Sequence, residues 1–187
     1  MPFIRESILV SLGPDGRPHL APLGLHERGE ELVIAPFRPS ATLANLERTP
    51  FATACYTADV RVFAGCVTGR RREWPLLPAE RISGFRLADC LAHEELEVIA
   101  VEPDDLRPRF RCRILHGRTH APFTGFNRAR FAVIEAAILL SRRHLLPEAE
   151  IEEGLARLAV LVDKTAGDAE REAWAWLVEA WARPERS

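Results

Sequence analysis

The feature that most constrains the fold of this chain is a change in the spacing of its apolar residues near 124–126. Before this point, short apolar runs are separated by turn residues, which indicates β-strands; after it, apolar residues recur every three or four positions, as in amphipathic helices. Strands are predicted at 3–12, 18–25, 31–37, 51–57, 87–102 and 107–118, with a short helix at 40–47. Because helices do not alternate with the strands, a doubly wound sheet is disfavoured and a small antiparallel barrel with an α-helical addition is expected.

The helical third is predicted to start at Asn127, which is a good N-cap residue. Pro147 is expected to open a second helix, and the pair Gly167-Asp168 separates a third. Two stretches in the first part are less regular: 59–69 has helical spacing but is short, and 70–84 begins with the run Arg70-Arg71-Arg72, carries two prolines and is interpreted as an exposed loop. We therefore predict two domains, residues 1–125 and residues 126–187.

Composition narrows the class of protein. The net charge of −2 gives no basic field for nucleic acid, and no run of 18 uncharged apolar residues predicts a membrane span. The N-terminus has no basic region followed by an apolar run, so a cytoplasmic protein is expected. The four cysteines are far apart and lie in apolar stretches, which indicates buried free thiols rather than zinc ligands or disulfides.

The turn after the third predicted strand has the chemistry of a phosphate site. Arg38 can direct two N–H groups at a phosphate, and Ser40 and Thr42 add hydroxyl donors at the start of the short helix. The unpaired N–H groups and the dipole of this helix also favour an anion. The alternative is that Ser40 or Thr42 only caps the helix.

Other polar patterns are weaker. His116 and His120 stand four apart, but Gly117 and Pro122 argue against a helix there, so no metal site is predicted. Arginines alternate with other residues along 107–113, which fits either a solvated sheet face or a surface for a phosphate or an acidic partner. Motifs of hydrolases and nucleotide triphosphatases are missing, and no side chain stands out as an acid or a base, so no catalytic residue is assigned.

Several segments together resemble a known family. They are Asp15–Pro18, Ala21–Gly24, Pro36–Leu46, Asp59–Ala64 and Phe126–Ala136. Over roughly 3–146 the chain is similar to an uncharacterised family of archaea and some methylotroph bacteria with a flavin-reductase-like, FMN-binding split barrel. The resemblance implies an α+β fold: an antiparallel, six-stranded Greek-key split β-barrel at 1–125, with a C-terminal α-helical hairpin or bundle.

The resemblance also implies a ligand and an assembly. FMN is the expected cofactor, held near the subunit interface of a homodimer. Arg38, Ser40 and Thr42 would contact its phosphate and ribityl chain, and Asn45 would brace the turn. The backbone of Ala21, Pro22, Leu23 and Gly24 would line the isoalloxazine ring. Where such sequences tend to have Asn, this chain has Cys55, which leaves Thr57 as the substitute contact.

The function that the resemblance implies is that of a flavin-dependent oxidoreductase, in which FMN takes a hydride from a reduced nicotinamide or deazaflavin and passes it to a small-molecule redox partner. A non-catalytic protein that binds FMN or a pterin-type cofactor in one-carbon metabolism is the alternative, with the basic strand at 107–113 facing a polyanionic ligand. A third possibility is an interaction domain whose helical tail builds an oligomer and which binds no small molecule.

Overall fold

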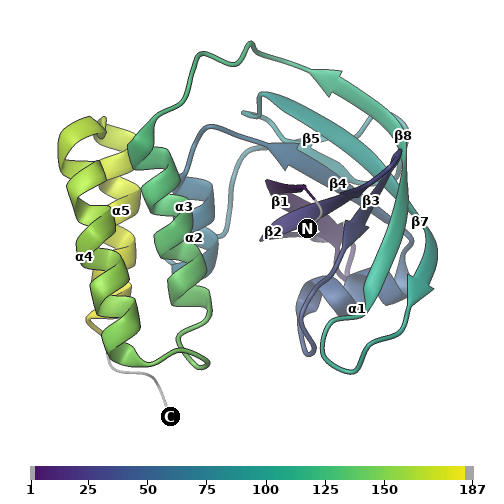
Figure 1. Cartoon of the computed structure of the whole chain (residues 1–187). Helices are drawn as coiled ribbons and strands as arrows, with labels where there is room; N and C mark the ends of the chain where they lie inside the picture. The colour runs from purple at the N-terminus through teal and green to yellow at the C-terminus, as the bar shows by residue number, and fades with distance from the viewer. Residues whose placement is uncertain (1–2, 184–187) are drawn as a thin grey trace. The chain divides into compact units, whose positions relative to one another are not determined.

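The computed structural model describes residues 3–183 (Figure 1). The chain divides into two compact units. One unit contains the chain up to Thr57 together with Trp74–Pro122, and the other contains Ala58–Glu73 together with the chain from Phe123 on. The predicted division at 125/126 kept the segment 58–73 with the strands, whereas in the structure this segment belongs to the helical unit.

Within the described residues, the first unit is a closed antiparallel barrel with strand order β1-β2-β3-β8-β7-β4 (Figure 1). Its strands are β1 (Ile4–Leu12), β2 (Pro18–Arg28), β3 (Glu31–Ile34), β4 (Phe51–Tyr56), β7 (Ala92–Glu102) and β8 (Arg109–Thr119). Helix α1 (Ala41–Arg48) connects β3 to β4 and packs against β1 and β2. The predicted antiparallel barrel is confirmed.

The barrel closes around alternate, inward-facing side chains of its strands. Leu9, Leu25, Ile34, Leu96 and Phe110 are among its nearly inaccessible residues, and each comes from a different strand. Because side chains of a strand alternate between its two faces, the residues between these core positions lie on the outer surface of the barrel. Some of these outward positions are nevertheless buried, which shows that other segments cover them.

The segment that covers part of the outer surface of the barrel was predicted incorrectly. The strand expected over 87–102 is in fact two elements, β6 (Phe85–Leu87) and β7, with a turn between them. The stretch 70–84, expected to be an exposed loop, contains β5 (Leu76–Pro78), which pairs with β6 in a separate two-stranded sheet. Ile82, Leu87 and Cys90 are buried, so this region is held by long-range packing that local spacing does not reveal.

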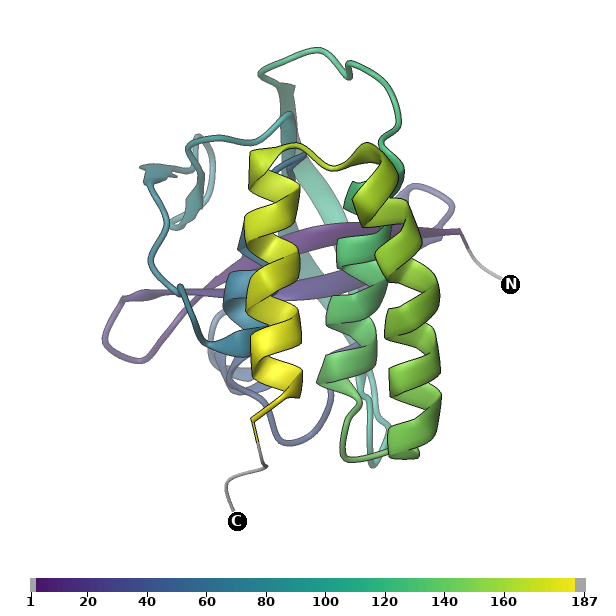
Figure 2. The same ribbon diagram turned by 90° about the vertical axis from the view of Figure 1, so that its left-hand side faces the viewer.

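The second unit is helical (Figure 2). Its helices are α2 (Arg61–Thr68), α3 (Arg128–Ser141), α4 (Glu148–Thr165) and α5 (Asp168–Trp181). Asn127 caps α3 as predicted, because its Oδ1 accepts hydrogen bonds from the N–H groups of Ala129 at 2.8 Å and Arg130 at 3.1 Å. Figure 2 shows α3, α4 and α5 side by side, which confirms the expected C-terminal bundle. None of the described helices is long and apolar enough to cross a membrane.

The helical unit contains a nearly buried carboxylate whose charge depends on pH. Nε of Arg130 donates to Glu170 at 2.9 Å, and the N–H of Gly167 donates to it at 3.0 Å. Burial alone would raise the pKa of Glu170, but these hydrogen bonds hold the pKa below its ordinary value. A carboxyl group of this kind stabilises the fold above its unfolded pKa, about 4.3, and its contribution is lost as pH falls through the lower, folded pKa.

We therefore expect the Tm of the wild-type chain to fall more steeply below about pH 5 than the Tm of Glu170→Gln, because the glutamine has no proton to gain. Thermal unfolding followed by circular dichroism at several pH values measures the two slopes. Parallel curves would show that the Glu170 carboxylate does not contribute to acid sensitivity.

Candidate functional site

The predicted phosphate turn forms the N-terminus of α1. Ser40 has an extended backbone, and its Oγ accepts a hydrogen bond from the N–H of Leu43 at 3.2 Å, so Ser40 is the N-cap. The first intrahelical bond runs from the N–H of Ala44 to the carbonyl of Ser40. The N–H groups of Ala41 and Thr42 precede this bond, so they are the helix donors left for an anion.

Arg38 lies beside this helix start, but acidic side chains surround it. Its Nη2 is 3.3 Å from Oε1 of Glu47, and the arginine side chain is half exposed. Arg38 and Glu47 line a depression of about 320 Å³ together with Val101, Pro103, Asp104, Asp105 and Pro108. Hydrogen bonds from the N–H groups of Arg107 and Leu106 hold the pKa of Asp104 below its ordinary value. A phosphate at Arg38 would therefore compete with carboxylates.

The two other predicted residues of α1 lie inside the fold. Thr42 is 3% exposed and Asn45 is 5% exposed. Nδ2 of Asn45 donates to Oγ of Ser11 at 2.9 Å, which ties α1 to the end of β1. This contact is compatible with a bracing role for Asn45. Thr42 is enclosed by the protein, so its side chain is better placed to shape the helix start than to meet a ligand from solvent.

The segment Ala21–Gly24 lies in the middle of β2 and is half-buried. It pairs with β1, from Leu9 opposite Ala21 to Glu6 opposite Gly24. On its other side β3 pairs only with His26–Arg28. Within the described sheet, the backbone of Ala21–Gly24 therefore has no neighbouring strand on the β3 side, although the carbonyl of Leu23 accepts a hydrogen bond from Oγ of Ser7 at 2.8 Å and Pro22 has no N–H to offer.

The helix start and the β2 segment are brought to one part of the barrel. Ser11, which bonds Asn45 of α1, is the register partner of His19 on β2. Ala21–Gly24 follow at about 7–17 Å along the same strand, given a rise of about 3.4 Å per residue. An elongated ligand with an anionic end and a flat end fits this spacing.

Thr57 does not join this group. It follows the end of β4 that is farther from α1, and β1 separates β4 from β2 in the barrel. Its Oγ1 donates to the carbonyl of Asp89 at 3.2 Å. Cys55 is fully buried, and its sulfur accepts the N–H of Leu87 at 3.3 Å, so this position offers no contact to a ligand.

Two of the alternating arginines of β8, Arg111 and Arg113, form ion pairs. Nε and Nη2 of Arg111 each lie 2.8 Å from a carboxylate oxygen of Glu31, and Nη2 of Arg113 lies 2.6 Å from Glu97. Arg111 holds the pKa of Glu31 below its ordinary value. An open hollow of about 720 Å³ is lined by Arg28, Glu30, Glu31, Arg111, Arg113 and Ile114. Paired charges of both signs fit the solvated sheet face better than a polyanion site.

The sequence prediction missed the acidic neighbours of Arg38. Glu47 lies in the last turn of α1, and Asp104 and Asp105 lie between β7 and β8, far from Arg38 in the sequence. No local spacing in the sequence places Asp104 and Asp105 near Arg38, because these two residues approach it only when the turn between β7 and β8 closes. The N–H of Arg38 donates a hydrogen bond to the carbonyl of Leu106 at 2.9 Å, which shows that this turn lies against the segment of Arg38.

A six-stranded closed barrel of this kind, with added helices, places the chain in the class of flavin-reductase-like split barrels. The FMN-bound protein MM1853 of Methanosarcina mazei matches over 96% of both chains, with a TM-score of 0.82 and 22% identity. The 2-nitrobenzoate 2-nitroreductase NbaA of Pseudomonas fluorescens has a TM-score of 0.55 and 18% identity, over 64% of this chain and 66% of the other. Flavoredoxin of Methanosarcina acetivorans has a TM-score of 0.52 and 14% identity, over 64% and 69%.

The family is also shown at the level of sequence. The profile of the N-terminal domain of a protein family of unknown function, DUF447, matches residues 5–121, and a second DUF447 profile matches residues 127–179. This chain belongs to the DUF447 family. The predicted membership in an uncharacterised family with the split-barrel fold is confirmed. No curated protein matches the sequence.

Proposed function

We propose that this chain is an FMN-binding flavoprotein that acts as an oxidoreductase. The observation that carries the proposal is the likeness to MM1853, a protein assigned to DUF447 whose structure contains FMN and which matches nearly the whole chain. The nitroreductase NbaA and flavoredoxin share the barrel. When bound, FMN supplies hydride transfer; the protein supplies binding, orientation and electrostatics.

The proposed site uses the two segments that the structure brings together. The free N–H groups at the start of α1 and the guanidinium of Arg38 would hold the phosphate, with Ser40, Thr42 and Asn45 fixing the turn. The open backbone edge of Ala21–Gly24 would face the isoalloxazine ring. Thr57 is left out of this site because it lies at the other end of β4 from α1. A homodimer belongs to the proposal, with the second subunit covering the open edge.

Titration of the purified full chain with FMN tests the binding. We expect saturation at one FMN per chain, with quenching of flavin fluorescence and a shift of the flavin absorption band, because the ring leaves water for a flat, partly apolar slot. Light scattering with and without FMN measures the expected dimer. A chain that leaves the fluorescence and the absorption of added FMN unchanged would contradict the proposal.

Anaerobic mixing of the FMN-loaded chain with NADH, NADPH and a reduced deazaflavin tests the activity. Bleaching of the flavin band by one of these donors, faster than for free FMN, is the expected result. Bound FMN that none of them reduces faster than free FMN would instead favour the non-catalytic cofactor-binding protein. Flavin binding and flavin reduction are thus separate outcomes.

A further inference from the structure

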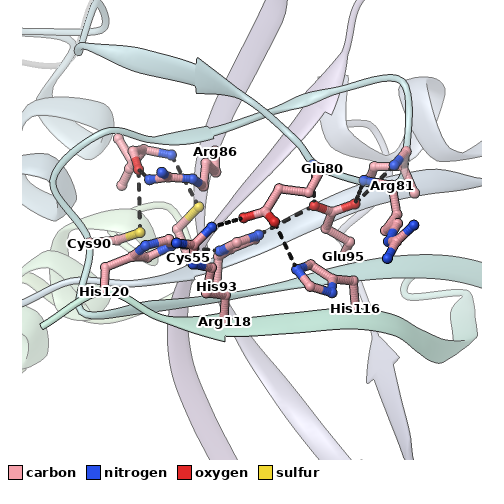
Figure 3. Close-up of polar contacts among 12 residues, drawn as sticks. Cys55, Glu80, Arg81, Arg86, Cys90, His93, Glu95, His116, Arg118 and His120 are labelled. Atoms are coloured by element: carbon pink, nitrogen blue, oxygen red, sulfur yellow. Dashed lines mark hydrogen bonds and ion pairs between the residues drawn. The ribbon is translucent and has the colours of Figure 1, made fainter.

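We propose that Glu80, His93 and His116 bind a divalent transition-metal ion of the zinc class on the outer face of β7 and β8 (Figure 3). One possible ligand atom from each residue lies within 4.8 Å of the others. Ligands of one zinc ion lie at most about 4.2 Å apart when each bond is about 2.1 Å. Glu80 is exposed, so its carboxylate has room to adjust toward an ion held by the two histidines.

Strand pairing places these side chains on one face. Thr53, Glu95 and His116 are register partners across β4, β7 and β8, and Cys55, His93 and Arg118 form the next such row. The two rows are two residues apart on β7, so their side chains point to the same side. The spacing of His116 and His120 was dismissed because it does not fit a helix. His116 lies in β8, and His120 follows directly after the strand, where its Nε2 contacts His93.

His93 is oriented as metal-binding histidines are. The ring is fully buried, and its Nδ1 lies 2.8 Å from Nε2 of His120. Nε2 of His93 is hydrogen-bonded to Oε1 of Glu95 at 3.3 Å, and a metal ion at this nitrogen would replace that hydrogen bond, with Nδ1 then carrying the proton toward His120. Metal-bound histidines commonly have the second nitrogen held in this manner, which fixes the tautomer and the direction of the ring.

Glu95 fixes the loop that carries Glu80. Its carboxylate accepts hydrogen bonds from the N–H groups of Glu80 at 2.5 Å, Arg81 at 2.7 Å and Ile82 at 2.9 Å. The backbone at Glu80 is therefore held against β7. The two oxygens of the Glu80 carboxylate have different neighbours: Oε1 lies 3.1 Å from Nη1 of Arg118, and Oε2 lies 3.3 Å from Nε2 of His116.

An unsatisfied polar atom points to a missing ligand. Among the described residues, the buried side-chain nitrogen and oxygen atoms without a hydrogen bond are Nε2 of His116 and Oγ1 of Thr53. Both belong to the row centred on Glu95. Buried polar atoms in native proteins nearly always have a hydrogen-bond partner. Nε2 of His116 lies 3.3 Å from Oε2 of Glu80 without forming a hydrogen bond to it, so its lone pair is positioned for a metal ion that Glu80 also contacts.

The donor set selects the class of ion. Two imidazole nitrogens and one carboxylate oxygen suit zinc and neighbouring transition metals, whereas calcium and magnesium prefer oxygen ligands alone. The carboxylates of Glu80 and Glu95 outnumber the guanidinium of Arg118 next to them, so the local charge favours a dication. Three protein ligands leave a position for water, as in zinc sites with an open coordination position.

Zinc titration of the chelator-treated full chain, followed by calorimetry, tests the site. We expect one Zn²⁺ per chain, and at least a hundredfold weaker binding for His116→Asn and for Glu80→Gln, because each substitution removes a ligand. His120→Asn is expected to weaken binding by about 10–100-fold, as loss of a partner behind a metal ligand does. The matched control is His144→Asn, which changes an exposed histidine outside the cluster and should leave the affinity unchanged.

Three results would overturn the assignment: weak zinc binding by the wild-type chain, equal affinity in the wild type and His116→Asn, or a loss caused by His144→Asn. X-ray absorption of the zinc-loaded chain adds a structural readout, with imidazole scattering expected in the wild type and reduced in His116→Asn. Circular dichroism of the metal-free variants shows that they are folded. FMN titration is measured separately, because none of these residues belongs to the proposed flavin site.

Discussion

Replacing Glu95 by Gln is expected to lower the free energy of unfolding by about 3 kcal/mol, since the carboxylate is a buried acceptor of three backbone N–H groups. The amide of glutamine keeps one acceptor oxygen but turns an NH₂ group toward a donor. At least one buried N–H then loses its partner, and bonds to a charged acceptor become bonds to a neutral one. The loop that covers the outer face of β7 is expected to loosen.

Urea denaturation followed by circular dichroism, in the presence of a chelator, measures this effect without a contribution from metal. Glu97→Gln is the matched control, because Glu97 lies two residues along the same strand and pairs with the half-exposed Arg113 at 2.6 Å. Ion pairs of that exposure contribute at most about 1 kcal/mol. Equal losses in the two variants would show that the backbone hydrogen bonds to Glu95 add no stability.

The barrel could be predicted because alternation and turn residues are local signals. The closed order of its strands and the packing of Leu96 and Phe110 into its centre follow from the pattern of alternate apolar residues. The same pattern gave no sign of the buried His93 and Glu95. Polar residues on the outer face of a strand are normally interpreted as exposed, and only the loop between β5 and β6, which is distant in the sequence, buries them.

Helix α2 is a second element for which the sequence pattern alone was not sufficient. Its helical spacing was visible, but a run of this length between glycines did not decide between helix and loop. In the structure, Val60 and Ala64 pack with Val133 and Ala136 of the helical unit, and Gly69 ends the helix with a φ of 69°. The helix is formed because of that packing, since an isolated helix of two turns is not stable in water.

The start of α1, in contrast, was predicted correctly because it depends only on residues close in the sequence. An N-cap depends on residues three apart, so Ser40 and the N–H of Leu43 are sufficient to define it. The charge around Arg38 depends instead on Glu47 and on the turn between β7 and β8. The local pattern was therefore enough to predict the N-cap of α1, whereas the acidic residues near Arg38 could not be predicted from it.

The competition between Glu47 and a phosphate for Arg38 leads to a second prediction with a large effect, this time on FMN affinity, and it rests on the proposed flavin site. Arg38→Ala is expected to weaken FMN binding by about 10–100-fold, because a guanidinium–phosphate contact is worth roughly 1.5–3 kcal/mol. Glu47→Gln is expected to tighten FMN binding several-fold, since Arg38 then has no carboxylate partner at 3.3 Å to exchange for the phosphate. Fluorescence titration at a fixed, low salt concentration measures both affinities.

Arg38→Ala and Glu47→Gln are expected to change the FMN affinity in opposite directions, and this makes their comparison informative. General destabilisation of the barrel would weaken FMN binding in both variants, whereas competition for one guanidinium separates them. Arg28→Ala and Glu102→Gln are the controls, because this exposed pair at 2.7 Å resembles the Arg38–Glu47 pair in kind, and neither residue is among those that line the depression at Arg38. If Arg38→Ala binds FMN as Arg28→Ala does, the phosphate is not held at the start of α1, and the barrel then binds flavin through another part of its surface.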